Sequence, residues 1–155
     1  MVASVIEDGV WIGGVADVTP TFLAENTIQV VISVLENHEI TNDIDNLKNI
    51  AGVEWHQVAL ADTPEADAAT QFRAVDTIIS ATKQAHKNVL IHCCEGTDRS
   101  AALLVAHYMI SNQWSRKQAV EHVTRARLTV DIRDGLMNQL GGLDGSIRLG
   151  LYNVD

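Results

Sequence analysis

The run Ala101 to Ile110 restricts the fold more than any other part of the sequence, because it is apolar on nearly every face. A helix on the surface of a domain carries a polar stripe, whereas a helix that is apolar all round lies in the centre of the domain. A short apolar strand, Asn88 to Ile91, precedes this run, and one polar loop separates the two. The sequence therefore predicts a central strand, loop and buried helix around which the remaining elements pack.

Strand-like and helix-like segments alternate along the rest of the chain. The expected strands are short runs rich in β-branched residues: Val10 to Ile12, Ile28 to Leu35 and Val53 to Leu60. Four helices are expected. The first begins at Thr19-Pro20, and the second spans Asp67 to His86 with Phe72, Val75 and Ile79 on one face. The third runs from the capping box of Ser115 and Gln118 to about Arg127, and the fourth covers Asp134 to Leu140. The acidic segment 36–50 is expected to be loop with one helical turn. This alternation predicts an α/β fold, a single domain over residues 1–155 with a central, mostly parallel sheet flanked by helices.

Length and composition favour one soluble domain in a reducing compartment. The 155 residues are 46% apolar, which is enough for a substantial core, and no stretch approaches the roughly 20 apolar residues of a membrane span. The N-terminus lacks the basic region of a signal peptide, and the two cysteines are adjacent, so they cannot cross-link distant segments. A net charge of −9 argues against nucleic acid and anionic membranes as partners. We therefore expect a cytoplasmic protein, while the sequence indicates no oligomeric state.

The loop between the central strand and the buried helix carries the chemistry. It reads His92, Cys93, Cys94, Glu95, Gly96, Thr97, Asp98, Arg99, Ser100. A tight loop that enters a helix N-terminus points backbone N–H groups inward and binds anions, and the helix dipole adds positive potential there. Arg99 supplies a planar fork that holds two oxygens of a phosphate, and Cys93 supplies a thiol that is nucleophilic as the thiolate. The segment therefore predicts a loop that binds phosphate and presents a nucleophile to it.

This loop resembles the Cys-x5-Arg signature of the protein tyrosine phosphatases, in the fuller form His-Cys-x-x-Gly-x-x-Arg-[Ser/Thr]. Asp62 lies 31 residues before Cys93, where the dual-specificity branch of that superfamily places its general acid. The resemblance covers roughly residues 8–142 and leaves 143–155 as a tail. It implies a dual-specificity phosphatase that needs no metal and no cofactor. The implied substrates are phosphorylated proteins that carry phosphotyrosine and phosphoserine or phosphothreonine.

The resemblance also implies a role for each residue of the site. Cys93 attacks phosphorus and forms a phosphocysteine, while Arg99 holds the phosphate oxygens. Asp62 donates a proton to the leaving oxygen and then activates the water of the second step. Ser100 helps the sulfur to leave, and His92 orients the loop and supports the thiolate. The phosphate is bound by Arg99 together with the rest of the loop: Cys94, Glu95, Gly96, Thr97 and Asp98.

Two acidic residues, Glu95 and Asp98, depart from the usual loop of that branch and leave the substrate class open. One alternative is a phosphatase for phosphoinositides, nucleotides or sugar phosphates, for which Arg127 and Arg133 are candidates for a basic pocket rim. Another is a module that binds phosphoproteins without turnover. Asp98 is in addition a candidate second acid, and Cys94 is expected to be a small packing residue.

Overall fold

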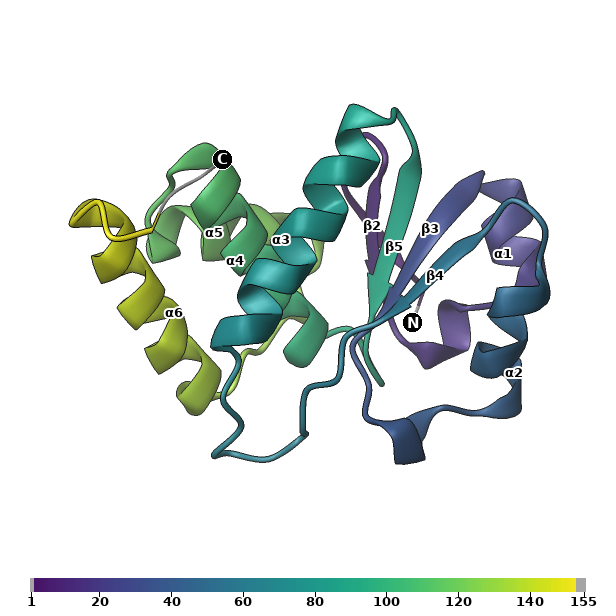
Figure 1. The fold of residues 1–155 in the computed structure, drawn as a ribbon, viewed down its shortest axis with the longest axis horizontal. Coiled ribbons are helices and arrows are strands. Elements are labelled where there is room, and N and C mark those ends of the chain that lie inside the picture. Colours follow the sequence, from purple (N-terminus) through teal and green to yellow (C-terminus); the bar gives the residue numbers. More distant parts are fainter. Residues whose placement is uncertain (1, 153–155) are drawn as a thin grey trace.

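The computed structural model describes residues 2–152, in which a five-stranded sheet lies between two layers of helices (Figure 1). The strands are β1 (Ser4–Glu7), β2 (Val10–Gly13), β3 (Ile28–Ser33), β4 (Glu54–Gln57) and β5 (Asn88–His92). They lie in the order β1-β2-β5-β3-β4, and every neighbouring pair is parallel except β1 and β2. The α/β fold with a mostly parallel sheet is therefore confirmed, and β5 is the central strand.

The helices divide unequally between the two faces of the sheet, as Figure 1 shows. One face carries the four longest, α3 (Ala69–Gln84), α4 (Arg99–Asn112), α5 (Arg116–Ala126) and α6 (Asp134–Arg148). The other carries α1 (Pro20–Glu25) and α2 (Asn42–Asp45), and the chain also forms the 3-10 helices η1 (Val15–Asp17), η2 (Asn37–Glu39) and η3 (Asn46–Asn49). Helix α4 contacts β5 and all three of its long neighbours. No helix within residues 2–152 has both the length and the apolar character needed to cross a membrane.

Alternating side chains of the central strand enter two separate cores. In β5, Val89 and Ile91 pack with α4 in the larger core, whereas Leu90 packs against Val31 and Ile44 on the opposite side. All three strand residues are fully buried. Successive side chains of a strand point to opposite faces of the sheet, so a strand covered on both faces reads as a continuous apolar run. The sequence of β5 shows this pattern.

Several local predictions are confirmed by the structure. Helix α1 starts with Pro20 in its first turn, and the hydroxyl of Thr19 accepts the N–H of Phe22. Ser115 and Gln118 form the expected capping box of α5. The helix expected around residues 101–110 is buried from Arg99 to Ile110. These signals depend on neighbouring residues in the sequence, which is why they can be recognised without the fold.

Other local predictions are wrong in their bounds. Helix α6 continues to Arg148 rather than ending near Leu140, so part of the expected tail is helical. Its glycines lower helix propensity, but Leu143 is buried in the core and Ile147 packs against it. The acidic segment 36–50 holds η2, α2 and η3 instead of one turn, β4 is shorter than expected, and β1 was not expected at all. Residues 153–155 of the expected tail lie outside the described residues.

Candidate active site

The predicted phosphate loop, residues 93–98, leaves the carboxyl end of β5 and enters α4. Gly96 lies at its tightest point, with φ of +72°. A Cβ at this position would lie 2.3 Å from the carbonyl oxygen of Gly13 in β2, so only glycine fits. On the same side, the N–H of Val15 donates to the carbonyl of Cys94 at 2.9 Å. The segment that follows β2 therefore fixes the course of the loop.

Cys93 lies at the bottom of a hollow of about 190 Å³ that opens at this edge of the sheet. The residue is 4% exposed, and its Sγ lies 3.2 Å from Oγ of Ser100 in the first turn of α4. A hydroxyl at this distance can donate a hydrogen bond to a thiolate. The hollow is lined by Asp62, Cys93, Cys94, Glu95, Thr97, Asp98 and Arg99. The structure therefore brings together around one hollow most of the side chains that the sequence singled out.

The guanidinium of Arg99 is buried and is held by Glu39, a residue that the sequence analysis missed. Nη1 donates to Oε1 of Glu39 and Nη2 to Oε2, each at 2.8 Å, which is the strong bidentate arrangement of an arginine and a carboxylate. Nη1 also donates to the carbonyl of Leu60 at 2.9 Å, and Nη2 to Sγ of Cys94 at 3.4 Å. Because of its bonds to Arg99, the pKa of Glu39 falls from 4.5 to about 2. This carboxylate is therefore ionised at neutral pH.

These four bonds occupy the four N–H groups of the two η nitrogens of Arg99. A phosphate that binds Arg99 must use Nε–H or displace one of the present partners. The bond to Cys94 is the longest of the four, and a thiol sulfur is a weak acceptor. It is therefore the easiest to replace, while Glu39 and Leu60 hold the rest of the guanidinium in place.

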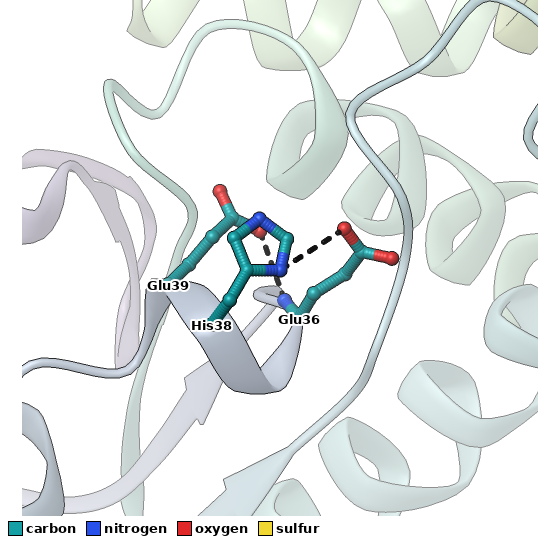
Figure 2. A group of neighbouring side chains, drawn as sticks. All are labelled: Glu36, His38 and Glu39. Atoms are coloured by element: carbon teal, nitrogen blue, oxygen red, sulfur yellow. Dashed lines mark hydrogen bonds and ion pairs between the residues drawn. The ribbon is translucent and has the colours of Figure 1, made fainter.

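Glu39 belongs to η2, where it lies beside Glu36 and His38 (Figure 2). One ligand atom from each of these side chains lies within 4.8 Å of the other two, a spacing that a metal ion accepts. Oε1 of Glu39 also accepts the N–H of Glu36 at 2.9 Å, and both of its oxygens already pair with Arg99. His38, in contrast, is exposed. We therefore assign Glu39 to the orientation of Arg99.

His92 is fully buried below the loop and takes part in a chain of three hydrogen bonds. Its Nδ1 lies 3.0 Å from the carbonyl oxygen of Cys93, and its Nε2 lies 2.6 Å from Oγ of Ser33, which accepts the indole N–H of Trp55 at 2.9 Å. A carbonyl only accepts, so Nδ1 carries the proton and Nε2 accepts from Ser33. Burial lowers the pKa of His92 to about 4, so the ring is neutral at pH 7. This arrangement fits the expected orienting role, whereas support of the thiolate by a positive charge does not fit a neutral ring.

Asp62, the predicted general acid, lies at the rim of the hollow and is paired with Arg133. Its side chain is 56% exposed and forms an ion pair with Nη2 of Arg133, and its Oδ2 lies 3.9 Å from Nη2 of Arg99. The other partner of Arg133 is Asp98, which accepts the backbone N–H of Arg133 at 2.9 Å and its Nε–H at 2.5 Å. Both oxygens of Asp98 are therefore occupied by Arg133. Arg133 pairs with only Oδ1 of Asp62, so the occupation of both oxygens argues against Asp98, and not against Asp62, as the acid.

Arg127 and Cys94 both lie in positions that differ from those expected. Arg127 is 3% exposed and donates to the carbonyls of Glu95 and Gly96 from beneath the loop, so it is not part of a rim. Cys94, expected to be a packing residue, is exposed, and its thiol donates to Oε2 of Glu39 at 3.3 Å. Burial of part of this thiol and its bond to Glu39 raise the pKa of Cys94.

The residues that the sequence analysis missed share no motif with the loop. Glu39 comes from a polar turn about sixty positions away, and its spacing gives no signal. Ser33 had one signal, because a polar residue ends an otherwise apolar strand at the edge where ligands bind in parallel sheets. Arg133 was noted only as a candidate for the rim.

A central strand, a tight loop that carries Cys93 and Arg99, and a buried helix together form this site. In agreement with this geometry, residues 10–143 match the family model of the dual specificity phosphatase catalytic domain. The chain therefore belongs to the dual specificity phosphatase family.

Curated relatives support the assignment. Dual specificity protein phosphatase 26 of Homo sapiens is 33% identical over 101 residues, which are 64% of this chain and 47% of that protein. Dual specificity protein phosphatase 14 of Homo sapiens is 29% identical over 135 residues, 83% of this chain and 68% of that protein. Protein phosphatase Slingshot of Drosophila melanogaster is 29% identical over 109 residues, 70% of this chain and 10% of that protein. The chain thus spans about half of phosphatase 26 and a tenth of Slingshot.

Solved structures show the same fold. The human tyrosine phosphatase-like serine/threonine/tyrosine-interacting protein has a TM-score of 0.85 at 22% identity, with 97% of this chain and 99% of that chain covered. Human DUSP28 has a TM-score of 0.82 at 19% identity, with 94% of this chain and 95% of that chain covered.

Proposed function

We propose that this protein hydrolyses phosphotyrosine and phosphoserine or phosphothreonine on proteins through a phosphocysteine, without a metal ion. The observation that carries the proposal is the arrangement around the hollow: Cys93 Sγ at its base, Arg99 in its wall and Asp62 at its rim. A nucleophile, a phosphate clamp and a proton donor are the three groups that such a reaction needs.

In the first step the thiolate of Cys93 forms a bond to phosphorus, and the bond from phosphorus to the ester oxygen breaks. The proton of the Asp62 carboxyl passes to that oxygen, so the leaving group departs as a neutral alcohol or phenol. In the second step water attacks the phosphocysteine, and Asp62, now a carboxylate, takes the proton of this water. The Cys93 sulfur leaves as a thiolate, to which Ser100 donates a hydrogen bond at the 3.2 Å separation seen here.

The breadth of the proposed specificity rests on the walls of the hollow. Its lining residues within the described chain include no aromatic side chain, so no ring stacks on the leaving group of a phosphotyrosine. A wall of this kind gives an aryl leaving group no advantage over a shorter alkyl one. The relatives named as dual specificity protein phosphatases agree with this choice of substrate.

The test measures phosphate release from a small aryl phosphate at mildly acidic pH with EDTA present. We expect turnover by the wild type, none by Cys93→Ser, and a loss of about 10² or more in Asp62→Asn, because a general acid contributes about 10² to 10⁴. The matched control is Asp67→Asn, which alters an exposed acid beyond the hollow.

Substrate class is tested next with peptides of one sequence that carry phosphotyrosine, phosphoserine or phosphothreonine, beside a phosphoinositide and a nucleotide. Turnover of the peptides supports the proposal. Exclusive turnover of the lipid or the nucleotide assigns the site to non-protein esters. A wild type that binds tungstate but releases no phosphate contradicts the catalytic proposal and favours a phosphate-binding module.

A further inference from the structure

Arg133 links the phosphate loop to the segment that carries the general acid. It lies at the N-terminal boundary of α6 and is partly buried, with 21% of its side chain exposed. Its backbone N–H and its Nε–H donate to Asp98 in the loop, while its Nη2 pairs with Asp62 across the rim of the hollow. One guanidinium thus spans two segments that are more than thirty positions apart in the sequence.

The segment between β4 and α3 depends on α6 for its position. It contains no helix or strand around Asp62, and Figure 1 shows it as a long curved connection that passes the start of α6. Its far end is fixed by Gln139, which donates to the carbonyl of Ala66 at 2.7 Å and accepts the N–H of Ala68 at 2.7 Å. The carboxyl of Asp62 pairs with two arginines, Arg133 and, at 3.9 Å, Arg99. Arg133 is therefore the closest side chain that fixes where this carboxyl lies.

The charge of Arg133 also explains why an acidic residue is tolerated inside a phosphate loop. Without it, Asp62, Glu95 and Asp98 would place three carboxylates around a bound phosphate dianion, and like charges this close oppose binding. Arg133 pairs with two of the three. Asp98 and Arg133 thus form one unit, in which the loop carboxylate anchors an arginine and the arginine places the acid.

We propose that Arg133 is a positioning residue for the general acid: anchored by Asp98, it holds the carboxyl of Asp62 at the rim of the hollow, from where this carboxyl donates its proton to the leaving oxygen. This inference rests on the proposed function, because it assigns Asp62 the acid role. A misplacement of about 1 Å in a catalytic group can cost about 10² in rate. Loss of Arg133 should therefore weaken proton donation and leave phosphate binding intact.

The experiment compares phenyl phosphate, whose leaving group needs a proton, with 4-nitrophenyl phosphate, whose leaving group needs it far less. The measured quantity is kcat/KM, which reports only the steps up to loss of the leaving group. In Arg133→Ala we expect kcat/KM for phenyl phosphate to fall by about 10 to 10², and for 4-nitrophenyl phosphate by less than about 3-fold. In the Asp62→Asn background the same change should have no further effect, since the acid is already absent.

The matched control is Arg148→Ala, which removes another ion-paired arginine from α6, bound to Asp144 away from the hollow. Arg148→Ala should leave kcat/KM unchanged for both substrates. In Arg133→Ala, inhibition by inorganic phosphate should stay within about 3-fold of wild type if Arg99 still holds the phosphate. Arg133→Lys keeps the charge without the fork, so we expect it to recover part of the lost activity. If Arg133→Ala does not fold, Arg133→Lys replaces it in the test. A larger loss of kcat/KM for phenyl phosphate than for 4-nitrophenyl phosphate in this variant supports the positioning role, and equal losses contradict it.

The positioning role would be overturned if Arg133→Ala lowered kcat/KM equally for both substrates, or lowered it as much in the Asp62→Asn background as in wild type. Either result would indicate that Arg133 only supports the loop. A wild type without turnover, or a Cys93→Ser variant that retains it, overturns the proposed function and this inference with it. The two failures are distinct, because the first leaves Cys93 and Asp62 essential and the second does not.

Discussion

Replacement of Glu39 by glutamine tests how much the structure gains from the pair that holds Arg99. The variant keeps the shape of the side chain and one acceptor oxygen but removes its charge. In the native state the pKa of Glu39 is about 2, against an ordinary value of 4.5. Each pKa unit corresponds to about 1.4 kcal/mol, so the ionised carboxylate contributes about 3 kcal/mol to the free energy of unfolding at pH 7. A change of this size is a large part of the total stability of a domain.

The sign of the pH dependence follows from the direction of the shift. A carboxyl whose native pKa is lowered stabilises the fold fully above its unfolded value, and this contribution is lost as the pH falls towards the native value. For Glu39 the window runs from pH 4.5 down to about 2. At pH 3 about half of this contribution remains, so the difference in the free energy of unfolding between wild type and Glu39→Gln should shrink by about half.

The assay is urea unfolding of both proteins at pH 7 and pH 3, with Glu25→Gln as the control. Glu25 is an exposed glutamate in α1, and its replacement should change stability by less than about 0.5 kcal/mol. If Glu39→Gln costs less than about 1 kcal/mol at pH 7, or costs the same at both pH values, the assigned role of the pair is wrong.

Two further predictions concern the backbone and the base of the loop. Gly96→Ala should abolish phosphate release and lower stability, because its Cβ would lie 2.3 Å from the carbonyl oxygen of Gly13. The control is Gly52→Ala, where φ is +80° but no atom lies within 4 Å of the new Cβ. This variant should lower the free energy of unfolding by only about 1 kcal/mol and leave activity unchanged. His92 has a native pKa of about 4 against 6.5, so the unfolded chain binds its proton first and the wild type should lose up to about 3 kcal/mol between pH 6.5 and 4. Chemical denaturation at several pH values measures this loss of stability, which should be smaller in His92→Asn. An identical loss in the variant would contradict the assignment of His92 as a buried neutral ring.

The sequence predicted those parts of the fold that depend on short-range patterns. The continuous apolar run of β5, the amphipathic spacing of α3 and the capping box of α5 each follow from residues a few positions apart, and the structure contains all three. The strand β1 was missed because Ser4–Glu7 has a single buried residue and is short. The end of α6 was missed because packing of Leu143 and Ile147 outweighs the low helix propensity of its glycines.

For the site, the sequence located the loop but not the side chains that hold it. Cys93, Arg99 and Ser100 lie within one motif, so their proximity follows from the sequence. Glu39, Ser33 and Arg133 reach the same place only through the order of the strands and the course of the connections. Tertiary structure decides which residues these three side chains contact, and no spacing along the chain encodes those contacts.

The contacts of Arg127 have a consequence for the order in which the loop around Cys93 is assembled. Besides the carbonyls of Glu95 and Gly96, its guanidinium binds the carbonyls of Val2 and Ile12 and the hydroxyl of Ser4, up to 125 positions away. Contacts of such long range require the closure of large loops and form slowly. The loop around Cys93 thus receives this support only when the end of α5 and the first two strands have met. A chain still emerging from the ribosome therefore carries Cys93 before Arg127 can support the loop that holds it.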